Sequence, residues 1–190
     1  FAFDTIDRIA ETNPDKQAMI YVDDDLQEKA ITFSDLKRNS NRCANYFTSL
    51  GIRKGDKVML ILKRHWQFWY TILGLHKIGA IAIPATNQLK VHDIVFRFEK
   101  ANVSAIVCTA DGNTAEQVDS AIESYDGIRV KIIAGGSRTG WKSFNDEYQL
   151  YSTHYKRTKA SAKGDDPMVM LFTSGTTGYP RLVVQNYKYV

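Results

Sequence analysis

Short apolar runs that alternate with amphipathic segments restrict the fold of this chain more than any other feature. Four runs have the length of β-strands and are apolar at nearly every position: "KVMLIL" (57–62), "AIAIP" (80–84), "SAIVCT" (104–109) and "RVKIIA" (129–134). Strands without a polar face belong to a sheet that is buried on both sides, and strands separated by helices run parallel. The sequence therefore predicts the α/β class, with a largely parallel sheet flanked by helices.

The helices between these runs have recognisable ends. Thr32 and Asp35 form a T-x-x-D variant of the capping box, which starts a helix, and Gly51 is placed to end it. The buried face of this helix is predicted to be Leu36, Ser40, Cys43, Phe47 and Leu50. Further helices are expected at 67–78, 91–100, 113–125 and, with a weaker pattern, from 143 to about 151.

A polar segment divides the chain into three parts. Residues 153–166, "THYKRTKASAKGDD", are interpreted as a solvated loop or a joint between subdomains. Residues 1–152 then form an α/β core, and residues 167–190 hold a strand and a glycine-rich loop. Because the 190 residues open at Phe1 without an initiator methionine, we expect one partial domain that begins inside a longer product or after processing.

Composition and charge argue against several classes of function. The 25 Lys and Arg are scattered among 21 Asp and Glu without a block of like charges, so no nucleic-acid binding is predicted. Charged residues at 63–64 and at 77 interrupt the most apolar region, which leaves less than the ~18 uncharged residues of a membrane span. Cys43 and Cys108 lack a paired spacing, which favours reduced thiols in a cytoplasmic protein. The histidines are isolated from the cysteines and from one another, so no metal site is predicted.

The most unusual segment lies near the end of the chain. The run "MVMLF" (168–172) is predicted to be a buried strand, so the next residues emerge at its carboxyl end, where open α/β sheets bind ligands. Gly175 and Gly178 let backbone amides approach an anion, and Arg181 adds a fixed positive charge. Hydroxyl donors follow the strand at Thr173, Ser174, Thr176 and Thr177. Together these groups are suited to hold a polyphosphate.

The common phosphate motifs do not account for this segment. A P-loop requires Gly-Lys-Ser/Thr to begin five places after its first glycine, but Pro180 stands five places after Gly175. The G-x-G-x-x-G spacing of dinucleotide sites is also absent. From these residues alone, a plain loop rich in Ser, Thr and Gly and a phosphate site are about equally supported.

The full string "FTSGTTGYPR" resembles the phosphate-binding signature of the adenylate-forming enzymes, which include acyl-CoA synthetases, adenylation domains of peptide synthetases and firefly-type luciferases. Their pattern is Thr-Ser-Gly-Thr-Thr-Gly, any residue, Pro and Lys, and Arg181 stands where Lys is usual. The segments "ITFSDLKRNSNRCANYFTSLGIRKGDKVMLIL" and "YTILGLHKIGAIAIPATNQL" also resemble the family. The chain is most similar to the first part of the acetyl- and medium-chain acyl-CoA synthetase branch.

The resemblance implies the N-terminal part of an acyl-CoA synthetase-like large domain and a reaction in two steps. A carboxylate attacks the α-phosphate of Mg-ATP, giving an acyl-adenylate and pyrophosphate, and the thiol of coenzyme A then displaces AMP. ATP, Mg²⁺, coenzyme A and a small carboxylic acid are the implied cofactors and partners, with the identity of the acid open. The implied residues around the β- and γ-phosphates are Thr173, Ser174, Gly175, Thr176, Thr177, Gly178, Tyr179, Pro180 and Arg181.

The resemblance also places later parts of such an enzyme beyond Val190. These are the adenine and ribose pockets, a glutamate that helps to hold Mg²⁺, the hinge and the catalytic lysine of a C-terminal domain. We therefore assign no catalytic residue, take the C-terminal domain as absent, and expect the 190-residue piece to be inactive. A sheet without its later strands could also self-associate through an uncovered edge.

Three alternatives stay open. The parent could be an adenylation domain that loads a carrier protein, or a phosphotransferase with an unusual loop. The chain could also be a non-catalytic truncated nucleotide-binding module, either natural or a laboratory fragment.

Two further clusters have simpler interpretations. Trp66, Phe68, Trp69 and Tyr70 could line an acyl or pantetheine channel, but aromatic residues on such a helix are more often packing residues. The acidic run 23–25 is expected to be a solvated hairpin turn rather than a metal site.

Overall fold

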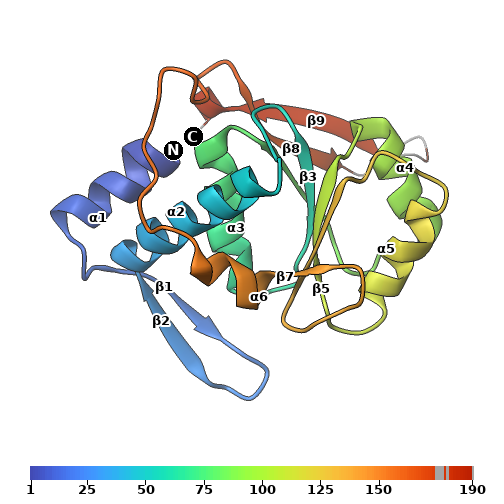
Figure 1. The fold of residues 1–190 in the computed structure, drawn as a ribbon, viewed down its shortest axis with the longest axis horizontal. Helices are drawn as coiled ribbons and strands as arrows, with labels where there is room; N and C mark the ends of the chain where they lie inside the picture. Colours follow the sequence, from blue (N-terminus) through green and yellow to red (C-terminus); the bar gives the residue numbers. More distant parts are fainter. Residues whose placement is uncertain (174–177, 179, 190) are drawn as a thin grey trace.

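The computed structural model describes residues 1–173, 178 and 180–189, and its centre is a seven-stranded sheet (Figure 1). The strands lie in the order β7-β6-β5-β3-β4-β8-β9. Neighbours are parallel except β8 and β9, which form an antiparallel hairpin at one edge. The strands are β3 (Lys57–Ile61), β4 (Ile81–Pro84), β5 (Ala105–Thr109), β6 (Val130–Ala134), β7 (Lys142–Ser143), β8 (Pro167–Thr173) and β9 (Arg181–Asn186). The predicted class, a largely parallel sheet flanked by helices, is confirmed.

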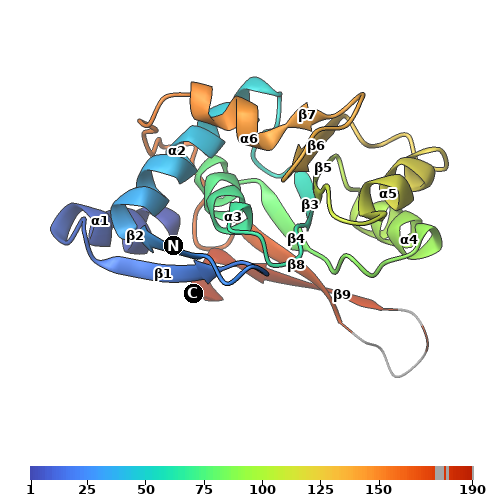
Figure 2. The ribbon, with the colours of Figure 1, turned by 90° about the horizontal axis from the view of Figure 1, so that it is seen from below.

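Helices cover both faces of the sheet (Figure 2). On one face lie α2 (Phe33–Ser49) and α3 (Gln67–Ile78), and on the other lie α4 (Val91–Ala101) and α5 (Thr114–Ile122). Side chains of the central strand β3 alternate between the two cores: Val58 and Leu60 pack with α2 and α3, whereas Met59 and Ile61 pack with α4. Because every one of these side chains is buried, the strand has no polar face, as its sequence predicts.

The capping signals predicted for α2 are present. The hydroxyl oxygen of Thr32 accepts a hydrogen bond from the Asp35 amide, and the Asp35 carboxylate accepts one from the Thr32 amide, each at 3.1 Å. Such a cap stabilises a helix by about 1 kcal/mol. On the predicted inner face, Leu50 alone is half-buried rather than buried.

The other helices follow the predictions with shifted ends. The helix predicted at 67–78 is α3, and Gly79 follows it in the left-handed conformation with φ +76°. The helix predicted at 113–125 is shorter and ends at Ile122. The weak helix predicted from 143 is a short α6 (Phe144–Glu147) continued by a 3₁₀ turn, η2 (Tyr148–Leu150).

The N-terminal segment adds elements outside the main sheet. A π-helical turn, η1 (Ala2–Asp7), and α1 (Arg8–Thr12) precede the hairpin β1 (Gln17–Val22) and β2 (Glu28–Thr32), and η3 (Tyr187–Tyr189) follows β9. In the hairpin turn the Asp23 carboxylate accepts hydrogen bonds from the amides of Asp25 and Gln27. The acidic run is thus the exposed turn that the sequence predicts.

The two cysteines belong to different sides of the sheet. Cys43 lies in the core under α2 and α3, and Cys108 lies in the core under α4 and α5. Both are buried and unpaired, as predicted, and burial raises the pKa of each thiol. Among the described residues, no helix has the length and apolar character to cross a membrane.

A long crossover carries the chain from β7 to β8. Because β7 lies at one edge of the sheet and β8 lies beyond β4, the crossover passes the intervening strands, and residues 151–166 do so without helix or strand. Just after β9, the hydroxyl of Tyr187 donates to the backbone carbonyl of His76 at 2.9 Å, which ties the C-terminal end of the β8–β9 hairpin to α3. The His76 ring also lies edge-on to Tyr187, with centroids 5.8 Å apart.

Burial of His76 makes the stability of the folded chain depend on pH. The side chain is buried, and neither ring nitrogen has a hydrogen-bond partner among the described residues. Burial disfavours the charged imidazolium and lowers the pKa of His76 to about 4, from an ordinary value of 6.5. The unfolded chain therefore takes up a proton at a higher pH than the folded chain, so stability falls as pH drops below 6.5.

We predict that the His76 contribution to the free energy of unfolding decreases by about 2 kcal/mol between pH 7.5 and pH 5. Urea titrations of the chain at both pH values measure the total change, and His76→Phe, which cannot take up the proton, should show a decrease smaller by that amount. An equal pH dependence in the parent and in His76→Phe would contradict the prediction.

Candidate functional site

The predicted phosphate loop joins β8 to β9, at the carboxyl end of β8. Thr173 and Arg181 are the last residues that pair across this hairpin, and the Thr173 hydroxyl donates to the Arg181 carbonyl at 3.5 Å. Gly178 has φ +102°, a backbone conformation that suits glycine and strains other residues. Both Thr173 and Arg181 are exposed, so a hydroxyl donor and a guanidinium stand at the two ends of the loop.

The structure thus places four of the nine predicted residues: Thr173, Gly178, Pro180 and Arg181. The other five lie outside the described residues; they are Ser174, Gly175, Thr176, Thr177 and Tyr179. The Arg181 side chain is exposed and forms no ion pair with another described residue.

The strand before the loop is less buried than predicted. Met168 and Val169 are buried, but residues 170–172 are half-buried. The reason is the position of β8 near the edge, where its outer neighbour is the largely exposed β9. The prediction of a fully buried strand at 168–172 was therefore wrong in its second half.

Helix α4 supports the base of the loop with a cation and an aromatic ring. The ring of Phe172 lies 6.2 Å from that of Phe96, and the guanidinium carbon of Arg97 lies 5.2 Å from the Phe172 centroid. The Arg97 side chain is only 12% exposed; it donates to the Asp93 carbonyl at 2.9 Å and pairs with the Asp93 carboxylate at 3.8 Å. Burial lowers the pKa of Arg97 without removing its charge.

Arg97 is a residue near the site that sequence reasoning missed. The helix pattern identifies the inner face of α4 as Ile94, Phe98 and Ala101, and these three are buried. Arg97 lies beside that face. The exposed side of the helix carries several charged residues, so one more arginine in the sequence does not indicate a nearby ligand.

A second polar cluster lies at the carboxyl ends of β3 and β5. The Nε2 atom of His65 is 2.7 Å from the Thr109 hydroxyl and 3.3 Å from the Asp111 carboxylate, and Lys63 Nζ is 3.5 Å from Asp111. A cavity of about 410 Å³ lies between this cluster and the hairpin turn that contains Asp24. Within the described part of the chain, no group of three or more His, Cys, Asp or Glu side chains is arranged to hold a metal ion.

The aromatic cluster on α3 divides into core and surface. Tyr70 is buried, while Trp66 and Phe68 are partly buried against the core under α2 and α3. Trp69 is 46% exposed and packs edge-on against Phe68. Packing explains the first three residues, as the sequence predicts, and does not explain Trp69.

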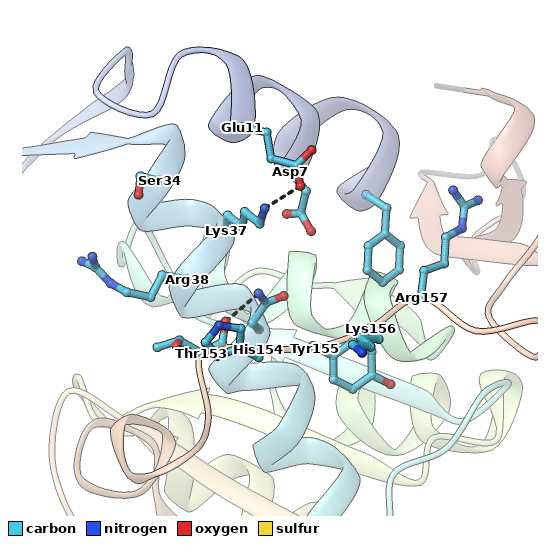
Figure 3. Close-up of a pocket in the computed structure, with 12 residues that line it drawn as sticks. Asp7, Glu11, Ser34, Lys37, Arg38, Thr153, His154, Tyr155, Lys156 and Arg157 are labelled. Atoms are coloured by element: carbon cyan, nitrogen blue, oxygen red, sulfur yellow. Dashed lines mark hydrogen bonds and ion pairs between the residues drawn. The ribbon is translucent and has the colours of Figure 1, made fainter.

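Another cavity is lined by residues far from the loop in the fold. It has a volume of about 540 Å³ and lies between η1, α1, α2 and the crossover (Figure 3). Figure 3 shows Asp7 and Glu11 from the N-terminal helices on one side and Thr153 to Arg157 of the crossover on the other. None of the four described residues of the predicted site lines it.

Comparisons with known proteins support the family resemblance of the chain. A model of the AMP-binding enzyme family matches residues 6–190. The chain is 32% identical over 193 aligned residues to mouse acyl-coenzyme A synthetase ACSM1, mitochondrial, covering 98% of this chain and 33% of the relative. It is 33% identical over 172 aligned residues to the human protein of the same name, covering 90% of this chain and 29% of the relative.

Solved structures share the fold. Acetoacetyl-CoA synthetase from Streptomyces lividans superposes with a TM-score of 0.86 at 21% identity, covering 98% of this chain and 30% of that one. The anthranilate CoA ligase AuaEII, crystallised with anthranoyl-AMP, superposes with a TM-score of 0.83 at 20% identity, covering 99% of this chain and 36% of that one.

The chain spans about a third of the length of the curated relatives that it matches. The family model, in contrast, matches nearly every residue of the chain, from Ile6 to the end. The chain therefore belongs to the AMP-binding enzyme family.

Proposed function

We propose that the full-length protein that contains this chain is an ATP-dependent, AMP-forming carboxylic acid–CoA ligase. The observation that carries the proposal is the string from Thr173 to Arg181, which matches the phosphate-binding signature of adenylate-forming enzymes except at Arg181. Its described ends lie at the mouth of a hairpin at the carboxyl end of β8, where open α/β sheets bind ligands. The similarity to acyl-CoA synthetases supports a CoA thioester as the product.

In this proposal the loop holds the β- and γ-phosphates of ATP and stabilises the pyrophosphate that leaves. The Thr173 hydroxyl would donate to a phosphate oxygen, and the left-handed Gly178 would turn backbone amides towards the phosphates. The Arg181 guanidinium would neutralise charge that accumulates on the leaving group. Ser174, Thr176 and Thr177 would add donors, an assignment that depends on the resemblance.

The chemistry assigned to these residues is positioning and charge stabilisation. Holding the leaving phosphates in line with the attacking carboxylate makes the first step effectively unimolecular, and the fixed donors stabilise the developing charge. The described residues offer no carboxylate cluster for Mg²⁺, so we assign the metal only as the counter-ion of ATP.

A carrier protein is the alternative acceptor to coenzyme A, and the acid itself is unassigned. The similarity to the ACSM synthetases favours CoA over a carrier-bound thiol. The expected cytoplasmic location stays a prediction, and the named relatives are mitochondrial proteins. Imaging of a tagged full-length protein decides between the two compartments.

We predict that the full-length protein exchanges radiolabelled pyrophosphate into ATP only when a carboxylic acid is present, and forms a thioester when CoA is added. A panel of acetate, butyrate, octanoate and benzoate measures the acid preference, and the 190-residue chain alone is expected to give no thioester. Exchange that does not depend on any acid in a broad panel, or transfer to a carrier protein but never to CoA, would contradict the proposal.

Arg181 supplies a second prediction. Its guanidinium and a lysine ammonium carry the same charge, but the arginine is bulkier and planar. In the full-length protein, Arg181→Lys should release pyrophosphate at a rate equal to or above that of the parent. A fall of more than about tenfold, equivalent to ~1.4 kcal/mol of transition-state stabilisation, would show that the guanidinium itself is required.

Gly178 supplies a third prediction, with a matched control. An alanine at φ +102° strains the backbone by about 1–3 kcal/mol, so Gly178→Ala should raise the KM for ATP by at least about fivefold. Gly140 also has a positive φ, +79°, and nothing within 4 Å, but lies on the connection between β6 and β7. Gly140→Ala should strain the chain similarly and leave the KM for ATP unchanged; an equal rise in both variants would count against the loop assignment.

A further inference from the structure

The position of β8 depends on a crossover that has little regular structure of its own. Residues 151–166 contain no helix or strand, and their internal backbone hydrogen bonds are two turns, from Ser161 to Thr158 and from Asp166 to Lys163. A segment of this kind takes its path from contacts with the rest of the protein. The path matters because it determines where β8 enters the sheet beside β4.

A row of polar side chains on α2 holds the first part of the crossover. Asn41, Asn45 and Ser49 are spaced by four residues, so they share one face of the helix. The Asn41 amide donates to the carbonyl of residue 153 at 2.8 Å, and the Asn45 amide donates to the carbonyls of residues 152 and 154 at 2.9 and 3.0 Å. The hydroxyls of Ser49 and Tyr151 are hydrogen-bonded to each other at 2.8 Å. Three successive backbone carbonyls are thus bound by two asparagines.

The orientation of Asn41 is fixed by a buried charge. Lys77, whose side chain is 0% exposed, donates to the Asn41 carbonyl oxygen at 2.7 Å and to the Asp7 carboxylate at 2.8 Å. An ammonium group has no acceptor, so the oxygen of the Asn41 side chain must face Lys77 and its NH₂ must face the crossover. Lys77 and Asn41 together therefore link η1, α3 and the crossover.

The second part of the crossover is anchored close to the hairpin. Lys54 pairs with Asp166 at 2.7 Å, one residue before β8 begins. The Lys188 amide donates to the Gly164 carbonyl at 3.0 Å, just after β9 ends. The segment between these contacts connects the α2 face to β8, and on it Arg157 pairs with Asp4 of η1.

We propose that Asn41 and Asn45 are positioning residues for the β8–β9 hairpin and, through it, for the loop that begins at Thr173. They act through the crossover: within the described part of the chain, their side-chain hydrogen bonds go to residues 152–154 and, for Asn41, to Lys77. Their expected effect on the KM for ATP rests on the proposed function. Their effect on the hairpin does not.

Aspartate substitutions isolate the contact to the crossover. In Asn41→Asp an oxygen remains to accept from Lys77, while the NH₂ that donates to the carbonyl of residue 153 is replaced by an oxygen. In Asn45→Asp the NH₂ that donates to the carbonyls of residues 152 and 154 is likewise replaced by an oxygen. Asn45 is only half-buried, so Asn45→Asp should fold even if Asn41→Asp does not. Asn39→Asp is the control, because the Asn39 amide donates to the Asp35 carbonyl within α2 itself.

The test is amide hydrogen exchange of the chain. We expect Asn45→Asp to speed exchange at residues 152–158 and in β8 and β9 by at least about tenfold, with β5 and β6 unchanged and with no effect in Asn39→Asp. Faster exchange throughout the sheet would mean a general loss of stability, and faster exchange at 152–158 with β8 and β9 unchanged would mean a purely local contact. Either result overturns the inference.

Kinetics of the full-length protein then separate this inference from the proposed function. Asn45→Asp should raise the KM for ATP by about threefold or more while the KM for the acid stays the same, and Asn39→Asp should change neither. If the exchange result holds but the protein forms no acyl-adenylate, the proposed function fails and the positioning role stands. If ligase activity is present and its KM for ATP is unaffected, the coupling of the α2 face to the loop is wrong.

Discussion

Burial of both faces of the central strands is the constraint on which the rest of this structure depends. Side chains of β3 and β5 alternate between two cores, and those of β5 are all buried. A strand of this kind requires a helical layer on each side, so the connections must leave the sheet on opposite faces. The chain satisfies this with α2 and α3 on one face and α4 and α5 on the other (Figure 2), and open sheets of this kind bind ligands at the carboxyl ends of their strands.

The same constraint explains why the candidate phosphate loop requires a long connection. Strand β7 lies at one edge of the sheet, and β8 adds beside β4 on the opposite side, so the chain has to pass the strands between them. The crossover reaches β8 over the α2 face, where asparagine side chains bind its carbonyls and a buried Lys77–Asp7 pair fixes one of those asparagines. At the far end, Phe172 packs against Arg97 and Phe96 of α4. The loop is thus supported from both helical layers.

The sequence predicts the interior of this fold better than its periphery. Apolar runs identify β3, β4, β5 and β6, and the capping box identifies the start of α2, because burial and capping leave local patterns. Strand β9 was not predicted as a separate strand, since Arg181–Asn186 is mostly exposed and shows no regular alternation. The short N-terminal helices were also missed, although Ala2, Ile6 and Ala10 are buried at spacings of four residues. Lys77 could not be predicted as a buried residue, because lysines are almost always exposed and its partner Asp7 is 70 residues away.

The candidate site was identified from one specific sequence string, and hydrophobic periodicity contributed little to it. Composition of the segment 173–181 left a loop and a phosphate site about equally supported, and the match to a known signature decided between them. Arg97 and the asparagines on α2 gave no signal, because their roles arise from contacts that form only in the folded chain.

The most direct measurement of the central claim compares ATP with AMP binding in the full-length protein. If the segment that ends at Arg181 holds the β- and γ-phosphates, Arg181→Gln should lower the affinity for MgATP and for pyrophosphate by about tenfold, which corresponds to the loss of one charge-assisted hydrogen bond. The affinity for AMP should stay the same. Calorimetric titration of the three ligands against the parent and the variant gives these affinities. An equal loss for AMP, or no loss for any of the three, would contradict the account.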